Sequence, residues 1–144
     1  MSEQLYKSPI GLYSLSFPEN WKVEENQEFV TFSEPQNGVG ALQISSYSTP
    51  EKQSSEELLL DYLSENGVVL DQSRIITKSL FGANVAHFEF IDLTWYRRVW
   101  FICRENYLLF VTYNCKIQSQ NFERAQIERI IGSIRVGVGD VNFV

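Results

Sequence analysis

The sequence predicts an α+β fold in which a central antiparallel sheet carries helices on both faces, as in an α/β/α sandwich. Three observations lead to this prediction. Apolar and alternating runs joined by tight turns fill residues 74–114 and indicate four antiparallel strands. Two segments with helical spacing, 54–66 and 119–131, lie on either side of this meander. The later strands are apolar on both faces, which an antiparallel sheet needs only when both faces are covered.

The chain is predicted to begin with a strand that ends at a corner. Residues 11–17 alternate between polar and apolar side chains, which is the period of a strand with one buried face. Pro18 has no backbone N–H for a central ladder, so the strand ends there. Glu19 and Asn20 suit a turn, and we expect this corner to swing Trp21 back over the sheet.

Two short strands are expected before the first helix. Residues 29–32 read Phe-Val-Thr-Phe, a β-branched and aromatic run that is closed by turn residues at 34–38. Residues 41–47 alternate in polarity, and the segment 48–50 then breaks the pattern with a proline. Both segments are therefore predicted to be strands.

The two helices have different start and stop signals. Ser54 and Glu57 form a capping box at the start of the first, and Gly67 supplies the expected stop. The second is expected over 119–131, with a buried face made of Phe122, Ala125, Ile127, Ile130, Ile131 and Ile134.

The four strands of the meander are joined by two-residue turns, and a short fifth segment follows the second helix. Turns are expected at 81–82, 92–93 and 105–106. The predicted strands are 74–80, 84–91, 94–104 and 107–114, with a last short strand at 134–138.

The order of these elements resembles the Mog/PsbP-like fold family. The matching segments are YSLSFPENW at 13–21, FVTFSE at 29–34, ALQISSYS at 41–48, FGANVAHFEF at 81–90, RENYLLFVTYNC at 104–115 and FERAQIERIIGSIRV at 122–136. The resemblance implies a central antiparallel sheet flanked by helices. Members of this fold serve as a photosystem II extrinsic subunit, a Ran-GTPase nucleotide-release factor, chaperones for secreted effectors or uncharacterised bacterial proteins. They share binding without covalent chemistry, so the resemblance implies an accessory role in a small bacterial protein.

Length and composition indicate one globular domain over residues 1–144. The chain is 44% hydrophobic, 14% aromatic and 21% charged, with a net charge of −6. This charge repels nucleic acid and anionic membranes. It indicates either plain solubility, which is the favoured interpretation, or a protein partner of basic charge. The first residues contain no apolar signal region, and no run of about 18 apolar residues occurs. A cytoplasmic location is therefore expected, the alternative being that a leader has been removed.

The two cysteines are expected to be separate thiols. With a turn at 105–106, Cys103 faces Leu108 and Cys115 faces Tyr96, so the sulfurs lie too far apart for a disulfide. Reduced thiols are typical of a cytosolic protein. The sequence offers no cluster of ligands around either cysteine, and neither a metal nor a cofactor is expected.

One face of the meander is predicted to bring polar side chains together. The expected register places His87 opposite Arg98, Glu89 opposite Tyr96, and Arg98 opposite Tyr113. A carboxylate beside a histidine can act as a base, so a small enzyme using His87, Glu89 and Arg98 is one interpretation. The other is a satisfied polar network in which Arg98 pairs with Glu89. A register shift of one residue would scatter the group over both faces.

Aromatic residues beside arginines are also typical of binding surfaces. Trp95 and Tyr96 lie next to Arg97 and Arg98, and these residue types dominate interface hot spots. We interpret Trp100 as core, and Trp95 and Tyr96 as candidate contacts whose exchange for alanine weakens partner binding at unchanged melting temperature. The favoured function is a non-catalytic protein-binding or accessory role, as an adaptor, an effector chaperone or an immunity-type protein.

Overall fold

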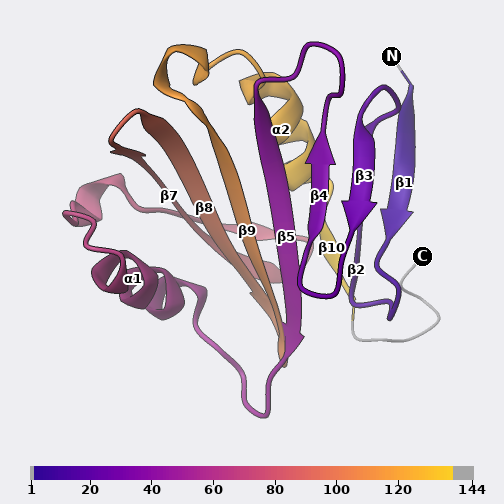
Figure 1. Cartoon of the computed structure of the whole chain (residues 1–144). Coiled ribbons are helices and arrows are strands. Elements are labelled where there is room, and N and C mark those ends of the chain that lie inside the picture. The colour runs from indigo at the N-terminus through magenta and orange to yellow at the C-terminus, as the bar shows by residue number, and fades with distance from the viewer. Residues whose placement is uncertain (1, 138–144) are drawn as a thin grey trace.

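The computed structural model describes residues 2–137, which fold into two antiparallel sheets and two α-helices (Figure 1). Seven strands form the larger sheet in the order β3-β4-β5-β9-β8-β7-β6, and three form the smaller one in the order β1-β2-β10. The strands are β1 Glu3–Lys7, β2 Tyr13–Pro18, β3 Lys22–Glu25, β4 Val30–Ser33, β5 Gly40–Ser48, β6 Ile76–Leu80, β7 Ala83–Asp92, β8 Trp95–Arg104, β9 Tyr107–Lys116 and β10 Arg135–Val136.

The predicted meander is confirmed as strands β6 to β9, with one difference in register. Arg98 of β8 lies opposite Tyr113 of β9, as expected. Between β7 and β8, however, Glu89 lies opposite Arg98 and His87 lies opposite Trp100. The turn between these strands falls one residue later than predicted, which shifts the register by two. Because side chains alternate with a period of two, this shift leaves each side chain on its predicted face.

Helix α1 (Ser55–Glu65) has the start and stop that its sequence indicates. The Ser54 hydroxyl accepts a hydrogen bond of 3.2 Å from the backbone N–H of Glu57. At the other end Gly67 adopts a left-handed φ of +68°, and the Val68 N–H donates to the Leu63 carbonyl at 2.9 Å. This is the hydrogen-bond pattern of a glycine-terminated helix. Both boundaries are therefore local in origin.

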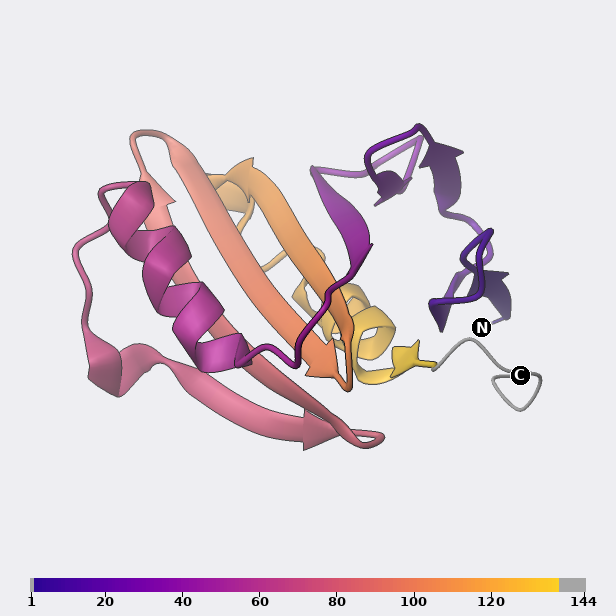
Figure 2. The same ribbon diagram turned by 90° about the horizontal axis from the view of Figure 1, so that it is seen from below.

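Helix α1 covers part of one face of the larger sheet. Its buried residues Leu59 and Leu63 pack in a cluster with Phe88 of β7 and with Val99 and Phe101 of β8. Figure 2 shows α1 lying along β7 and β8, while the N-terminal strands lie beyond β5 and away from this helix. The part of this sheet face beyond the end of α1 is left open to the groove described below.

Helix α2 (Arg124–Gly132) begins later than predicted. A short 3-10 turn at Ile117–Ser119 and a further turn precede it, so the expected start at residue 119 is wrong by five residues. Phe122 consequently lies outside the helix and is exposed. Ala125 was also expected on the buried face and is exposed. The rest of the apolar stripe is confirmed, because Ile127, Ile130, Ile131 and Ile134 are buried in the larger core cluster.

The second sheet was not expected, and it changes the description of the fold. The corner at Pro18 is confirmed by a 2.9 Å bond from the Trp21 N–H to the Pro18 carbonyl, but it carries the chain from one sheet to the other. The core on the α2 side is built mainly from strand residues of both sheets. The structure therefore supports a mostly antiparallel β-protein with two helices, richer in strand than the predicted sandwich. Neither helix in residues 2–137 has the length and apolar character needed to cross a membrane.

The last predicted strand is present in part. Strand β10 consists of Arg135 and Val136, which pair with Ser14 and Tyr13 of β2. The remainder of the predicted segment reaches residue 138, which lies outside the described residues. The partner of this strand is β2 in the smaller sheet, so the end of α2 is tied to the N-terminal part of the chain.

Candidate functional site

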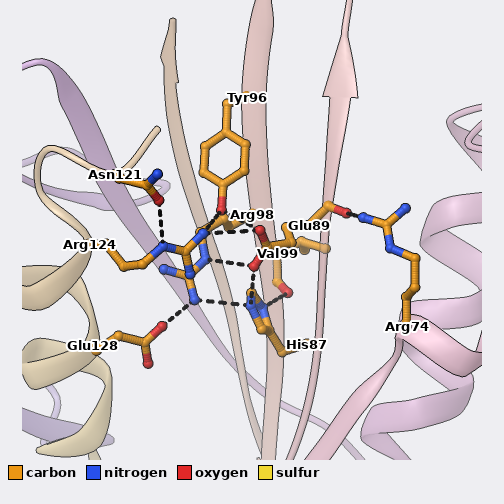
Figure 3. A network of polar contacts seen from close by, with 9 residues as sticks. All are labelled: Arg74, His87, Glu89, Tyr96, Arg98, Val99, Asn121, Arg124 and Glu128. Atoms are coloured by element: carbon orange, nitrogen blue, oxygen red, sulfur yellow. Dashed lines mark hydrogen bonds and ion pairs between the residues drawn. The ribbon is translucent and has the colours of Figure 1, made fainter. Parts of the chain in front are cut away.

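A connected polar network lies between strands β7 and β8 and helix α2 (Figure 3). Three elements supply two side chains each: His87 and Glu89, Tyr96 and Arg98, Arg124 and Glu128. Strand residues two apart point to the same face, and helix residues four apart lie on the same side. The spacing within each element thus brings the six side chains together, and we call them the sheet–helix network.

Arg98 is the buried cation of this network, with 3% of the residue exposed. Its Nη2 donates to Oε2 of Glu128 and, at 3.1 Å, to Nε2 of His87. Its Nε has no hydrogen-bond partner among the described residues and lies 3.9 Å from Oε2 of Glu89. The guanidinium also lies 4.6 Å above the ring of Trp100. Arg98 therefore ties α2 to the sheet through a charge-assisted hydrogen bond.

His87 is held in place by contacts at both ring nitrogens. Its Nδ1 lies 2.9 Å from the carbonyl oxygen of Val99, and its Nε2 faces Arg98. A guanidinium can only donate, so Nε2 is the acceptor and Nδ1–H donates to the carbonyl. The ring also stacks on Trp100 at 4.4 Å and is 4% exposed. Both nitrogens are engaged within the fold.

Glu89 accepts hydrogen bonds at the more open side of the network. Its Oε1 lies 2.7 Å from the Tyr96 hydroxyl and 3.1 Å from Nη2 of Arg124, which also lies 2.5 Å from that hydroxyl. Interaction with His87, and then with Tyr96 and Arg124, lowers the pKa of Glu89 well below its ordinary value despite partial burial. Burial and the Glu89 carboxylate raise the pKa of Tyr96. The carboxylate therefore stays ionised and the phenol protonated.

Two opposing effects act on the pKa of Glu128. Burial alone would raise the pKa of its carboxyl, but the hydrogen bond and charge of Arg98 lower it below the ordinary value. The half-exposed Glu128 carboxylate is consequently ionised near neutral pH beside the buried arginine. The pair connects α2 to the sheet.

The six residues singled out from the sequence do not form one site. His87, Glu89, Tyr96 and Arg98 belong to the network, and all but Glu89 are buried. Tyr113 instead donates a 2.7 Å hydrogen bond to the buried carboxylate of Glu123 at the start of α2. Trp95 lies on the opposite face of β8. A direct contact role for Tyr96 conflicts with its burial.

The sequence reasoning missed the two residues from α2. Arg124 and Glu128 stand at the spacing of Ile127 and Ile131, so all four lie on one side of the helix. A cation and an anion with helical spacing beside the buried apolar residues are a recognisable sequence signal. This signal could have identified Arg124 and Glu128.

A groove opens on the other face of the sheet, beside the end of α1. Its volume is about 810 Å³, within the usual range for small-molecule sites. The floor includes Phe90, Arg97, Thr112 and Asn114 from three adjacent strands, and the wall includes Tyr62 and Val69. We call it the α1 groove. It combines aromatic surface with a partly exposed cation, Arg97.

Metal and thiol chemistry receive no support within residues 2–137. No group of three or more His, Cys, Asp or Glu side chains in that part of the chain is placed to hold a metal ion. Cys103 and Cys115 are separate buried thiols, as predicted. Burial raises the pKa of Cys103 to about 11, so its reactive thiolate is scarce at neutral pH.

Comparison with protein families identifies the family to which the chain belongs. The family described as Domain of unknown function (DUF3805) matches residues 1–143. The chain belongs to this family. No curated protein matches the sequence.

Solved structures similar to this DUF3805 chain show its fold. One is a crystal structure from Bacteroides thetaiotaomicron VPI-5482, with a TM-score of 0.70 and 14% identity over 97% of this chain. The match covers 51% of that protein, so the DUF3805 chain spans about half of its length. Another is the solution structure of cyanobacterial PsbP (CyanoP) from Synechocystis sp. PCC 6803, with a TM-score of 0.69 and 12% identity over 94% of this chain and 93% of that one. These similarities show a PsbP-like fold.

The lowered pKa of Glu89 predicts an acid-dependent loss of stability in this DUF3805 chain. A carboxyl whose pKa is lower in the folded state stabilises that state above its unfolded pKa of about 4.5. The contribution is lost as the pH falls below this value toward the folded pKa. We expect the free energy of unfolding, measured by urea denaturation from pH 7 to pH 3, to fall more steeply for the wild type than for Glu89→Gln. Parallel curves would contradict the ionised role of Glu89.

Proposed function

We propose that this protein is a non-catalytic binding or accessory protein that contacts a protein partner through the end of the β7–β8 hairpin. The supporting observation is a group of exposed apolar side chains at the end of this hairpin: Ile91, Leu93 and Trp95 are 59%, 88% and 36% exposed. We call these three residues the hairpin-end surface. Exposed apolar groups that gather at one place are typical of interaction sites, whereas scattered ones are not.

The backbone at the hairpin tip favours the same interpretation. Leu93 has a φ of +61°, in the left-handed region that disfavours residues with a Cβ. Glycine, asparagine or aspartate is the usual choice at such a turn position. A strained and almost fully exposed leucine contributes little to folding, so we attribute it to contact with another molecule.

The charges around Trp95 indicate which groups the partner presents there. Nζ of Lys116 lies 4.5 Å from the centre of the Trp95 ring, and the Arg97 guanidinium lies 5.7 Å from it. A contacting segment with apolar side chains and carboxylates complements this end of the hairpin. The basic partner expected from the net charge of −6 stays a prediction for the rest of the surface.

The enzymatic alternative, which would use His87, Glu89 and Arg98, receives less support. Both nitrogens of His87 are engaged with Val99 and Arg98, and the side chain is buried. A general base needs a proton within reach of a free lone pair. Binding without covalent chemistry is also what the resemblance to the Mog/PsbP-like family implies.

The hairpin-end surface can be tested by capture of a partner followed by reconstitution. A protein captured by the immobilised chain is purified, and its affinity is measured for the wild type, Leu93→Gly and Trp95→Ala. We expect each variant to lose about tenfold in affinity, which corresponds to roughly 1.4 kcal/mol for one interface contact. The melting temperature should change little for Trp95→Ala and should not fall for Leu93→Gly, because both side chains are exposed and glycine suits the left-handed backbone at residue 93.

Two controls make the outcome decisive. Ile10→Thr removes an equally exposed apolar side chain at the β1–β2 turn and should leave the affinity unchanged. Tyr96→Ala should lower the melting temperature strongly, because this residue is buried. Equal affinity of the wild type, Leu93→Gly and Trp95→Ala for the purified partner would refute the proposed surface.

We also propose a bacterial cytoplasmic location, on the basis of the two thiols. Cys103 and Cys115 are both buried and neither is in a disulfide. Unpaired buried cysteines are typical of reducing compartments. Fusion of the natural gene to a redox-sensitive fluorescent protein would show the compartment directly, and an oxidised signal would contradict the proposal.

A further inference from the structure

The α1 groove places an apolar floor directly beside a set of hydrogen-bond donors. Register fixes this arrangement: Arg97 lies between Phe90 on one neighbouring strand and Asn114 on the other. One step along the strands, Val99 lies opposite Thr112. A charged residue, Arg97, and an apolar one, Val99, thus follow each other on the same face of β8. They lie in one hollow that β7 and β9 border.

The Arg97 guanidinium, which lies in the groove, is held only weakly by other side chains of the protein. Nη1 of Arg97 donates to Oδ1 of Asn114 at 2.8 Å, and its Nε donates to Oδ2 of Asp92 at 3.2 Å. The Asp92 carboxylate is half exposed, and ion pairs of this kind contribute about 0–1 kcal/mol. An incoming anion can therefore compete with Asp92 for the guanidinium at small cost.

Two residues with hydroxyl groups, Tyr62 and Thr112, line the same hollow. Neither hydroxyl hydrogen bonds to another residue within the described range 2–137. Burial raises the pKa of Tyr62, and the charge of Arg97 acts against that rise, which places the two groups within electrostatic reach. Tyr62 consequently stays a donor near neutral pH.

We propose that the α1 groove binds a small amphipathic carboxylic acid. The carboxylate bonds to Arg97 with the Tyr62 and Thr112 hydroxyls, and the hydrocarbon part packs on Phe90 and Val69. Of the three arginines that line the groove, Arg98 is buried beside Glu128 and Arg74 donates to the Glu89 carbonyl, which leaves Arg97 as the cation of this site. Because Arg97 already lies next to Asp92, it suits a monoanion better than a doubly charged phosphate. This site borders the protein contact proposed above and shares Arg97 and Ile91 with its surroundings, but the probes below test it without a protein partner.

Three probes of equal shape test the proposal by NMR titration of backbone amides: phenylbutyrate, phenylbutanol and phenylbutylamine. We expect chemical-shift changes at the amides of Phe90, Thr112 and Asn114, and about tenfold tighter binding of the acid than of the alcohol, as one charge-assisted hydrogen bond gives. The amine should bind most weakly. Equal binding of the acid and the alcohol, or shifts confined to residues outside the groove, would overturn it.

Variants separate the charge from the shape of the groove. Arg97→Gln should lose the preference for the acid while still binding the alcohol, and Arg97→Lys should retain most of that preference. Thr112→Phe fills the floor and should weaken all three probes. Arg129→Gln, which removes an exposed arginine of α2 outside the groove, is the matched control and should behave as the wild type. An Arg97→Gln variant that kept its preference for the acid would refute the assigned role.

Discussion

A Glu128→Ala variant should lower the free energy of unfolding by about 3 kcal/mol, at the low end of the cost of breaking a buried ion pair. The substitution leaves Arg98 charged and buried, with its Nε already lacking a partner among the described residues. Glu89 then becomes its nearest carboxylate, at 3.9 Å. The low end applies because Glu128 is half exposed, so water can enter when its side chain is removed.

Removing the cation as well should reverse much of this loss. In the double variant Arg98→Met with Glu128→Ala, an apolar side chain of similar length replaces the orphaned charge, and such replacements are often neutral. We expect at least half of the lost stability to return in urea denaturation. Glu3→Ala, which breaks the surface pair between Glu3 and Arg129, should cost at most about 1 kcal/mol. A Glu128→Ala variant as stable as Glu3→Ala would contradict the role given to Arg98.

A Gly40→Ala variant should lose about 2–3 kcal/mol, because there is no room for a methyl group. A Cβ at this position would lie 2.6 Å from the Asn114 carbonyl oxygen and 2.6 Å from the Tyr113 hydroxyl. The backbone contact cannot move without separating β5 from β9. The contact with Tyr113 also disturbs its hydrogen bond to Glu123 at the start of α2.

Another glycine of the same chain supplies the control. Gly132 ends α2, and a Cβ there would meet nothing within 4 Å. Gly132→Ala should therefore raise the free energy of unfolding by about 0.5 kcal/mol through the lower entropy of the unfolded chain. Equal stability of the two alanine variants, measured by urea denaturation, would show that β5 and β9 can relax around the added methyl group.

Several features of the candidate site could be predicted from the sequence. The tight turn at 105–106 and the length of its flanking runs place Arg98 opposite Tyr113, and the structure confirms that pair. The polar face of His87, Glu89 and Arg98 was also predicted, even though the pairing of β7 with β8 is shifted by two residues. Whether a side chain stays on the same face of the sheet depends only on whether the register shift is even or odd. Which residue it lies opposite depends on the number of residues in the shift. The turn was placed one residue early because Asp92, a usual turn residue, is the last residue of β7 and pairs with Trp95.

Other features had no local signal. Strand β1 was not expected, because its residues are mostly exposed and carry no apolar run. It exists as a strand because it pairs with β2. The start of α2 was predicted too early, since the spacing of Phe122 continues the apolar stripe although that side chain is exposed. The α1 groove likewise arises where a short helix leaves part of a wide sheet uncovered.

The sequence by itself determined the elements whose causes are local: the caps of α1, the corner at Pro18, the hairpin turns within one residue, and which strand residues share a face. These follow from backbone chemistry and from the period of two. Only the tertiary structure decided the division into two sheets, the partners of Arg98 and the hollow beside α1. Each of these depends on which distant segments pack together. The free energy of that packing comes from contacts across the whole chain, so no single stretch of sequence reveals it.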